Sequence, residues 1–151
     1  MPEVNSLKSI REEVTDPKSA SEQLNEKAIT DLRFLCSRMG YGLLNNVDYK
    51  ALYDAGSKKL CDFLVVGHEG RGKVSVPGNL IKDDKMYVAV VLYNNGTVKD
   101  AYLFAGENFM KPGLFSIFKR DKKNGTCYVD MSNETKTKPY SFGNVVQTIN
   151  G

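Results

Sequence analysis

The chain has 151 residues, a formal net charge of +3, and apolar (41%) and charged (26%) fractions that are typical of a soluble globular protein. No apolar run approaches the roughly 20 residues that a membrane helix requires, and the first residues lack the apolar stretch of a secretory signal. We therefore expect a cytoplasmic protein without a membrane partner. Its length suits a polar N-terminal segment (residues 1–18) followed by a single domain (residues 19–151).

The cysteines do not predict a disulfide or a metal site. Cys36, Cys61 and Cys127 are widely spaced, and each lies within an apolar segment. An odd number without a CxxC pair argues against a disulfide framework, and the single histidine leaves too few closely spaced ligands for zinc. We expect three buried free thiols.

The strongest helical pattern covers about residues 20–39. Ser19 and Glu22 form a capping box, and apolar residues recur every three or four positions up to Met39. Gly40 then supplies a stop signal. This pattern predicts an amphipathic helix with one face against a core.

Two shorter helices are predicted nearer the ends of the chain. The first is an N-terminal helix, because Leu7, Ile10 and Val14 have helical spacing before Pro17. The second covers the segment SFGNVVQTI (141–149), whose apolar residues also have helical spacing.

Strand patterns fill the region between the helices. Residues 41–46 predict a weak strand, and an irregular loop extends from there to about residue 56. The stronger strands are LCDFLVVG (60–67), KVSVP (73–77), MYVAVVLY (86–93), VKDAYLFA (98–105), LFSIFK (114–119) and TCYVDM (126–131). Asn-Gly turns at 95–96 and 124–125 predict two hairpins. The order of elements predicts an α+β fold, with a mixed sheet of about five strands between an N-terminal amphipathic helix and a short C-terminal helix.

A glycine-rich segment has the spacing of a phosphate-binding loop. Gly67 to Lys73 fits GxxxxGK after an apolar strand. Such a loop must open a helix and carry a Ser or Thr after the lysine, but Val74 follows Lys73 and the next residues favour a strand. We therefore interpret Leu60–Pro77 as two paired strands joined by a glycine-rich turn.

Between about residues 20 and 110, the order of elements resembles the PD-(D/E)XK (restriction-endonuclease-like) superfamily. The matching features are Glu26 in the first helix, Asp62 at the start of DFLVV, and the buried strand pair that follows. The resemblance implies a magnesium-dependent nuclease site of acids and one lysine. Aligned by strand, however, Ser75 and Pro77 occupy the places of the family's acid and lysine, which implies a scaffold that has lost its catalytic pair.

The first functional hypothesis is therefore a non-catalytic binding module without a cofactor. Its partner would be nucleic acid or another protein, and its binding residues would be the cations Lys119, Arg120, Lys122 and Lys123 with the nearby aromatics Phe115, Phe118 and Tyr128. Phosphate contacts combined with base stacking on aromatic rings are a known route to nucleic-acid binding.

The second hypothesis is a divalent-metal-dependent nuclease with a displaced site. Asp62, Glu69 and Lys73 would be catalytic, and Asp62 with Glu26 would bind Mg²⁺. Ordinary roles compete with this assignment: Glu26 as a surface acid, Asp62 paired with a neighbouring lysine such as Lys59, and a solvent-exposed His68. A small-ligand or purely structural role also stays open, because a fold does not define a function.

Overall fold

The computed structural model describes residues 19–45, 50–81, 85–121, 123 and 125–150. The helix predicted around Leu7, Ile10 and Val14 lies outside these residues. The helices are α2 (Ala20–Arg38), α3 (Glu107–Met110), α4 (Glu134–Thr137) and α5 (Phe142–Asn150), with 3₁₀ turns η1 (Gly78–Leu80) and η2 (Lys138–Tyr140). The strands are β1 (Gly42–Asn45), β2 (Lys50–Tyr53), β3 (Lys59–Glu69), β4 (Lys73–Val76), β5 (Tyr87–Asn94), β6 (Thr97–Ala105), β7 (Phe118–Arg120) and β8 (Cys127–Asp130).

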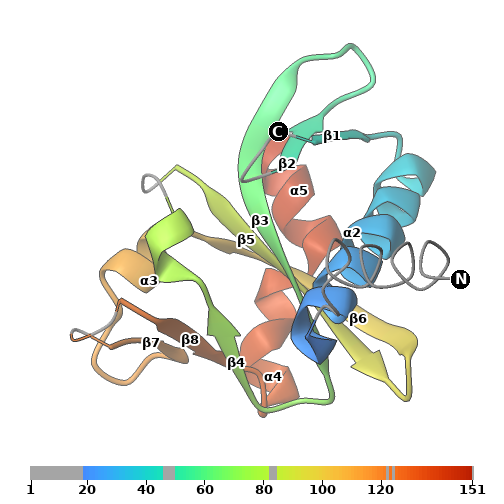
Figure 1. Ribbon diagram of the computed structural model, residues 1–151. Coiled ribbons are helices and arrows are strands. Elements are labelled where there is room, and N and C mark those ends of the chain that lie inside the picture. Colours follow the sequence, from blue (N-terminus) through green and yellow to red (C-terminus); the bar gives the residue numbers. More distant parts are fainter. Residues whose placement is uncertain (1–18, 46–49, 82–84, 122, 124, 151) are drawn as a thin grey trace, which may run out of the picture.

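The strands form two sheets, and the larger one confirms the predicted α+β fold. Its five strands have the order β1-β2-β3-β5-β6, and it is mixed because β3 and β5 are parallel whereas the other neighbours are antiparallel. The smaller sheet has the order β4-β8-β7 and is antiparallel throughout. Figure 1 shows the small sheet beside α3, away from α2.

The predicted pairing of β3 with β4 is wrong. β4 leaves the main sheet and pairs with β8, so that Val74 lies opposite Val129. The chain changes layers at Gly70 (φ 77°) and Gly72 (φ 148°), where it enters backbone conformations that glycine adopts without strain. β4 and η1 then supply part of the long crossover that the parallel pair β3–β5 requires.

One face of the main sheet packs against α2 and α5. α2 begins where the Ser19 side chain accepts a hydrogen bond from the Glu22 amide (3.2 Å), as the capping pattern predicts. Ala28, Leu32 and Cys36 then form its fully buried stripe. They pack with residues of the sheet and of α5 in one hydrophobic cluster. The predicted helices 20–39 and 141–149 are therefore confirmed, and both lie on this face.

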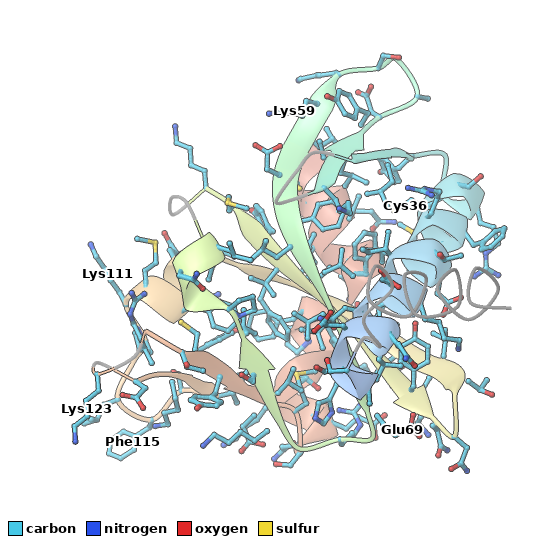
Figure 2. All side chains as sticks on the ribbon, in the orientation of Figure 1. Cys36, Lys59, Glu69, Lys111, Phe115 and Lys123 are labelled. Atoms are coloured by element: carbon cyan, nitrogen blue, oxygen red, sulfur yellow. The ribbon has the colours of Figure 1, made fainter. Side chains whose placement is uncertain are left out.

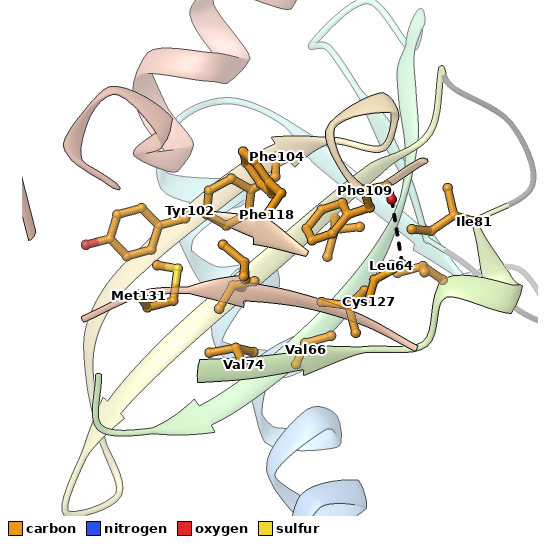
Figure 3. Close-up of a cluster of buried hydrophobic side chains, with 14 of the residues drawn as sticks. Leu64, Val66, Val74, Ile81, Tyr102, Phe104, Phe109, Phe118, Cys127 and Met131 are labelled. Carbon is orange, nitrogen blue, oxygen red and sulfur yellow. Dashed lines mark hydrogen bonds between the residues drawn. The ribbon is translucent and has the colours of Figure 1, made fainter. Parts of the chain in front are cut away.

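The other face packs against the small sheet and α3. Phe104, Phe109 and Phe118 meet edge-to-face here, with ring centroids 5.0 to 6.3 Å apart, and Val74 and Val129 come from the small sheet (Figure 3). Phe118 is 3% exposed. Its predicted place among the surface aromatics is wrong, because it belongs to this core.

The two hairpins predicted from Asn-Gly segments are both present in the fold. At the β5–β6 connection, Asn95 (φ 52°) and Gly96 (φ 79°) both have positive φ, which is the conformation that a tight primed hairpin turn needs. β7 and β8 also pair as predicted. Within the described part of the chain, no helix is both long enough and apolar enough to span a membrane.

Candidate functional site

Asp62 lies on β3 and is partly shielded from solvent. Its Oδ2 atom is 3.1 Å from the Lys59 ammonium, and its side chain is 26% exposed. Its Oδ1 atom is buried and has no hydrogen-bond partner among the described residues. The expected pairing of Asp62 with a neighbouring lysine is confirmed. Within the part of the chain that the structure describes, one carboxylate oxygen is therefore buried without a partner, which is uncommon for a carboxylate.

The other acids proposed for a nuclease site are not brought to Asp62. Asp62 and Glu69 lie toward opposite ends of β3, and at about 3.3 Å per residue their backbones are roughly 20 Å apart. In Figure 2, Lys59 and Glu69, the first and last residues of β3, lie at opposite ends of the view. Glu26 also lies away from Asp62. It follows Asn25 on α2, whose side chain accepts a hydrogen bond from the Gly67 amide (2.8 Å) near the far end of β3.

The described residues do not fit a bound Mg²⁺ ion. No group of three or more His, Cys, Asp or Glu side chains among them is placed to hold a metal. Asp62 is a single carboxylate beside an ammonium group, whereas Mg²⁺ requires octahedral oxygen coordination, usually with one or two carboxylates. A nuclease site of the expected kind would also need a lysine close to this carboxylate on the same strand. β3 is the third strand after α2, and the position two residues after Asp62 holds the buried Leu64.

The polar side chains of the glycine-rich segment have structural partners. Glu69 accepts hydrogen bonds from the Asn95 and Gly96 amides, so it holds the β5–β6 turn. The His68 ring Nδ1 is 3.0 Å from the Gly70 carbonyl oxygen. Lys73 begins β4 rather than a helix, as the strand interpretation expected.

Arg71 points back into the protein from the same segment. It donates to the Met131 carbonyl (2.9 Å) and the Tyr102 hydroxyl (2.5 Å), and it forms an ion pair with Asp100 (3.1 Å). These contacts connect the β3–β4 turn to β6 and to the end of β8. Its guanidinium is therefore committed to structure, and the segment is not arranged as a phosphate cradle.

The outer face of the small sheet combines an aromatic ring with cations. Tyr128 lies opposite Ser75 on one neighbouring strand and opposite Lys119 on the other. The Lys73 ammonium is 4.1 Å from the Tyr128 ring centroid, within the distance of a cation–π contact. Tyr128 is therefore half-buried, with cations on both adjacent strands. Sequence reasoning missed Lys73 for this role because the pairing of β4 with β8 joins distant parts of the chain.

The loop between α3 and β7 presents two apolar side chains to solvent. Leu114 is 81% and Phe115 is 91% exposed. The Lys119 ammonium donates to the Leu114 carbonyl oxygen (3.4 Å), which brings this loop beside the β7–β8 hairpin. In Figure 2, Lys111, Phe115 and Lys123 lie at the same end of the molecule.

We call this surface the basic tip. Its exposed cations are Lys73, Lys111, Lys119, Arg120 and Lys123, and its other members are Leu114, Phe115 and Tyr128. Lys122, the fourth cation of the predicted cluster, lies outside the described residues. Two nearby acids have local partners. Asp121 accepts the Lys123 amide (2.8 Å), and hydrogen bonds from Ser132 lower the pKa of Asp130 below its usual value.

Comparisons with known proteins add a distant structural likeness. The 1.6 Å structure of Archaeoglobus fulgidus Hjc, a Holliday junction resolvase from an archaeal hyperthermophile, is similar to this chain with a TM-score of 0.49 and 8% sequence identity, over 82% of this chain and 95% of that chain. No protein-family model matches the sequence, and no curated protein matches it. A likeness this distant assigns neither an activity nor a ligand to this chain.

Proposed function

We propose that this protein is a non-catalytic binding module that holds single-stranded nucleic acid on the basic tip. The observation that carries the proposal is Phe115, an aromatic side chain that is 91% exposed beside a group of cations. A solvent-exposed phenylalanine gains hydrophobic stabilisation when a partner covers it, so this ring is a favourable contact for a flat apolar surface.

The chemistry of the tip suits unpaired bases on a phosphate backbone. Every base has a flat face that stacks on an aromatic ring, and stacking contributes about 1–3 kcal/mol per base. Phe115 and Tyr128 offer two such rings, and the cations beside them are placed to contact phosphates. A duplex keeps its base faces stacked inside, so it offers the rings little. We therefore expect single strands to bind more tightly than duplexes of the same length.

Fluorescence anisotropy with a labelled 20-nucleotide single strand and its duplex tests the proposal. We expect Phe115→Ala to weaken single-strand binding by about tenfold, the loss of one stacked base. Combined Lys119→Glu and Arg120→Glu substitutions should remove binding. Lys58→Glu with Lys99→Glu makes the same change of charge away from the tip and serves as the matched control.

Two results would refute this function. One is absence of binding to any single strand at low salt. The other is tight binding to vesicles containing phosphatidylserine with none to nucleic acid, because exposed Leu and Phe side chains among lysines also suit an anionic membrane surface. Equal losses of single-strand affinity for the tip variant and the Lys58–Lys99 control would show that binding depends on overall charge and not on the basic tip.

The second candidate function is a divalent-metal-dependent nuclease at Asp62. The observation in its favour is the buried Oδ1 atom of Asp62, which has no partner among the described residues, while its Oδ2 atom lies beside the Lys59 ammonium. Cleavage of DNA in Mg²⁺ or Mn²⁺ that Asp62→Asn abolishes would establish this function.

A further inference from the structure

A groove of about 450 Å³ lies between α2 and α5, beside the edge strand β6. Its walls come from the second half of α2, the first half of β6 and the first turn of α5. This is the face of the main sheet that does not carry the small sheet, so the groove is separate from the basic tip. Its volume falls within the range of about 300–1,000 Å³ found for binding pockets.

Exposed apolar side chains border the groove. Phe34 on α2 is 67% exposed and Val98 on β6 is 44% exposed, and both line it. Deeper in, the lining includes the fully buried Leu32 and Phe142. A large apolar side chain of a partner could therefore cover Phe34 and Val98 and continue into the existing core.

The acids at the rim already have partners. Asp31 accepts a hydrogen bond from the Tyr93 hydroxyl (2.6 Å) and lies 3.7 Å from the Lys27 ammonium. Asp100 forms the ion pair with Arg71 (3.1 Å).

The cations at the rim are available. Arg38 and Lys99 both line the groove and are exposed, and within the described ranges neither has an ion-pair partner. Because the acids are neutralised locally and these cations are not, the groove presents an apolar floor with net positive charge at its rim. This combination is complementary to an apolar group next to carboxylates.

The free edge of β6 does not suit the addition of another strand. The register of β6 against β5 shifts so that Leu92 pairs with Asp100 and Tyr93 pairs with Val98, which leaves Lys99 as an extra residue in a bulge. Bulges and edge lysines are common protections against strand addition. An occupant is therefore expected to lie in the groove against side chains rather than to extend the sheet.

We propose that this groove binds a short acidic segment of another protein. The segment inserts a large apolar side chain between Phe34 and Val98 and places carboxylates beside Arg38 and Lys99. Binding of this kind follows the helix-in-groove mode, in which apolar anchors supply affinity and rim charges select the partner.

Three synthetic ten-residue peptides test the proposal with the full-length chain. The first repeats Glu-Glu-Leu-Phe, the second replaces every Glu by Lys, and the third replaces every Leu and Phe by Ser. We expect the first peptide alone to bind in a calorimetric titration and to shift the amide NMR signals around Phe34 and Val98. Phe34→Ala should weaken it by about tenfold or more, whereas Phe115→Ala at the basic tip should leave it unchanged.

A charge-reversal variant gives the sharpest result. Arg38→Glu with Lys99→Glu should lose the glutamate peptide and gain the lysine peptide, a reversal that unfolding cannot produce. Equal binding of the glutamate and lysine peptides, or binding of neither, would overturn the proposal. A dimer that Phe34→Ala dissociates would also overturn it, because a second copy would then fill the groove. So would peptide binding that appears only after Ile10→Ser with Val14→Ser, because the N-terminal segment of the chain itself would then be the occupant.

Discussion

Replacing Gly67 by alanine tests whether α2 crosses β3 as closely as the structure indicates. Gly67 is buried in β3, and a Cβ atom added there would lie 2.5 Å from the Leu24 carbonyl oxygen and 3.1 Å from the Ala28 Cβ. The nearer atom belongs to the backbone of α2, so it cannot rotate away as a flexible side chain would. The helix must move, and that movement would strain the hydrogen bond from the Gly67 amide to Asn25.

Overpacking of a core costs about 1–3 kcal/mol, and a clash with helix backbone belongs near the upper end of that range. At about 2–4 °C per kcal/mol for a protein of this size, Gly67→Ala should lower the Tm by roughly 5–10 °C. Calorimetry with urea unfolding measures both quantities. Gly143→Ala is the matched control, because its nearest atom is 3.8 Å away, and in helix α5 it should keep or raise the Tm. If the Tm of Gly67→Ala lies within about 1 °C of that of the unsubstituted protein, the close crossing of α2 and β3 is refuted.

Three further predictions concern binding, catalysis and the thiols. If all five described cations of the basic tip contact phosphates, the logarithm of the single-strand binding constant should fall with the logarithm of salt concentration with a slope of about −3.5, and a slope near zero would contradict phosphate contact. In Mg²⁺ or Mn²⁺ we expect intact DNA; if cleavage occurs, Asp62→Asn should abolish it and Glu69→Gln should not, since Glu69 holds a turn. Burial raises the pKa of Cys36 and of Cys61 to about 12, so the folded protein should resist thiol reagents at pH 8 and react only on unfolding. Because unfolded thiols ionise near pH 9, these two residues should also lower the free energy of unfolding as pH rises from about 9 to 12, and rapid labelling of the native protein would contradict their burial.

Features with local signals were predictable from the sequence. The helix Ala20–Arg38 carries its own cap at Ser19, and the β5–β6 turn depends on Asn95 and Gly96, which accept positive φ. The ion pair of Asp62 was also predictable, because its partner Lys59 is only three residues before it on β3. In each case the residues that decide the structure are close together along the chain.

Features that depend on distant parts of the chain were not predictable. β4 follows β3 after a short turn, which favours a hairpin, but its partner β8 lies about fifty residues further along. That pairing places Lys73 over Tyr128 and removes it from any site with Asp62. It also explains Phe118, whose alternation along a three-residue strand does not reveal which side of the strand faces the core.

The same long-range pairing has a consequence for how the molecule acquires its shape. The main sheet joins neighbours that are mostly close in sequence, so it has a low entropic barrier to assembly, whereas the small sheet must close a loop from Val76 to Cys127. We expect the small sheet to form after the main sheet during folding. Because α5 follows β8 along the chain, the groove that α5 helps to line is completed on the ribosome only after every strand of the small sheet has been synthesised.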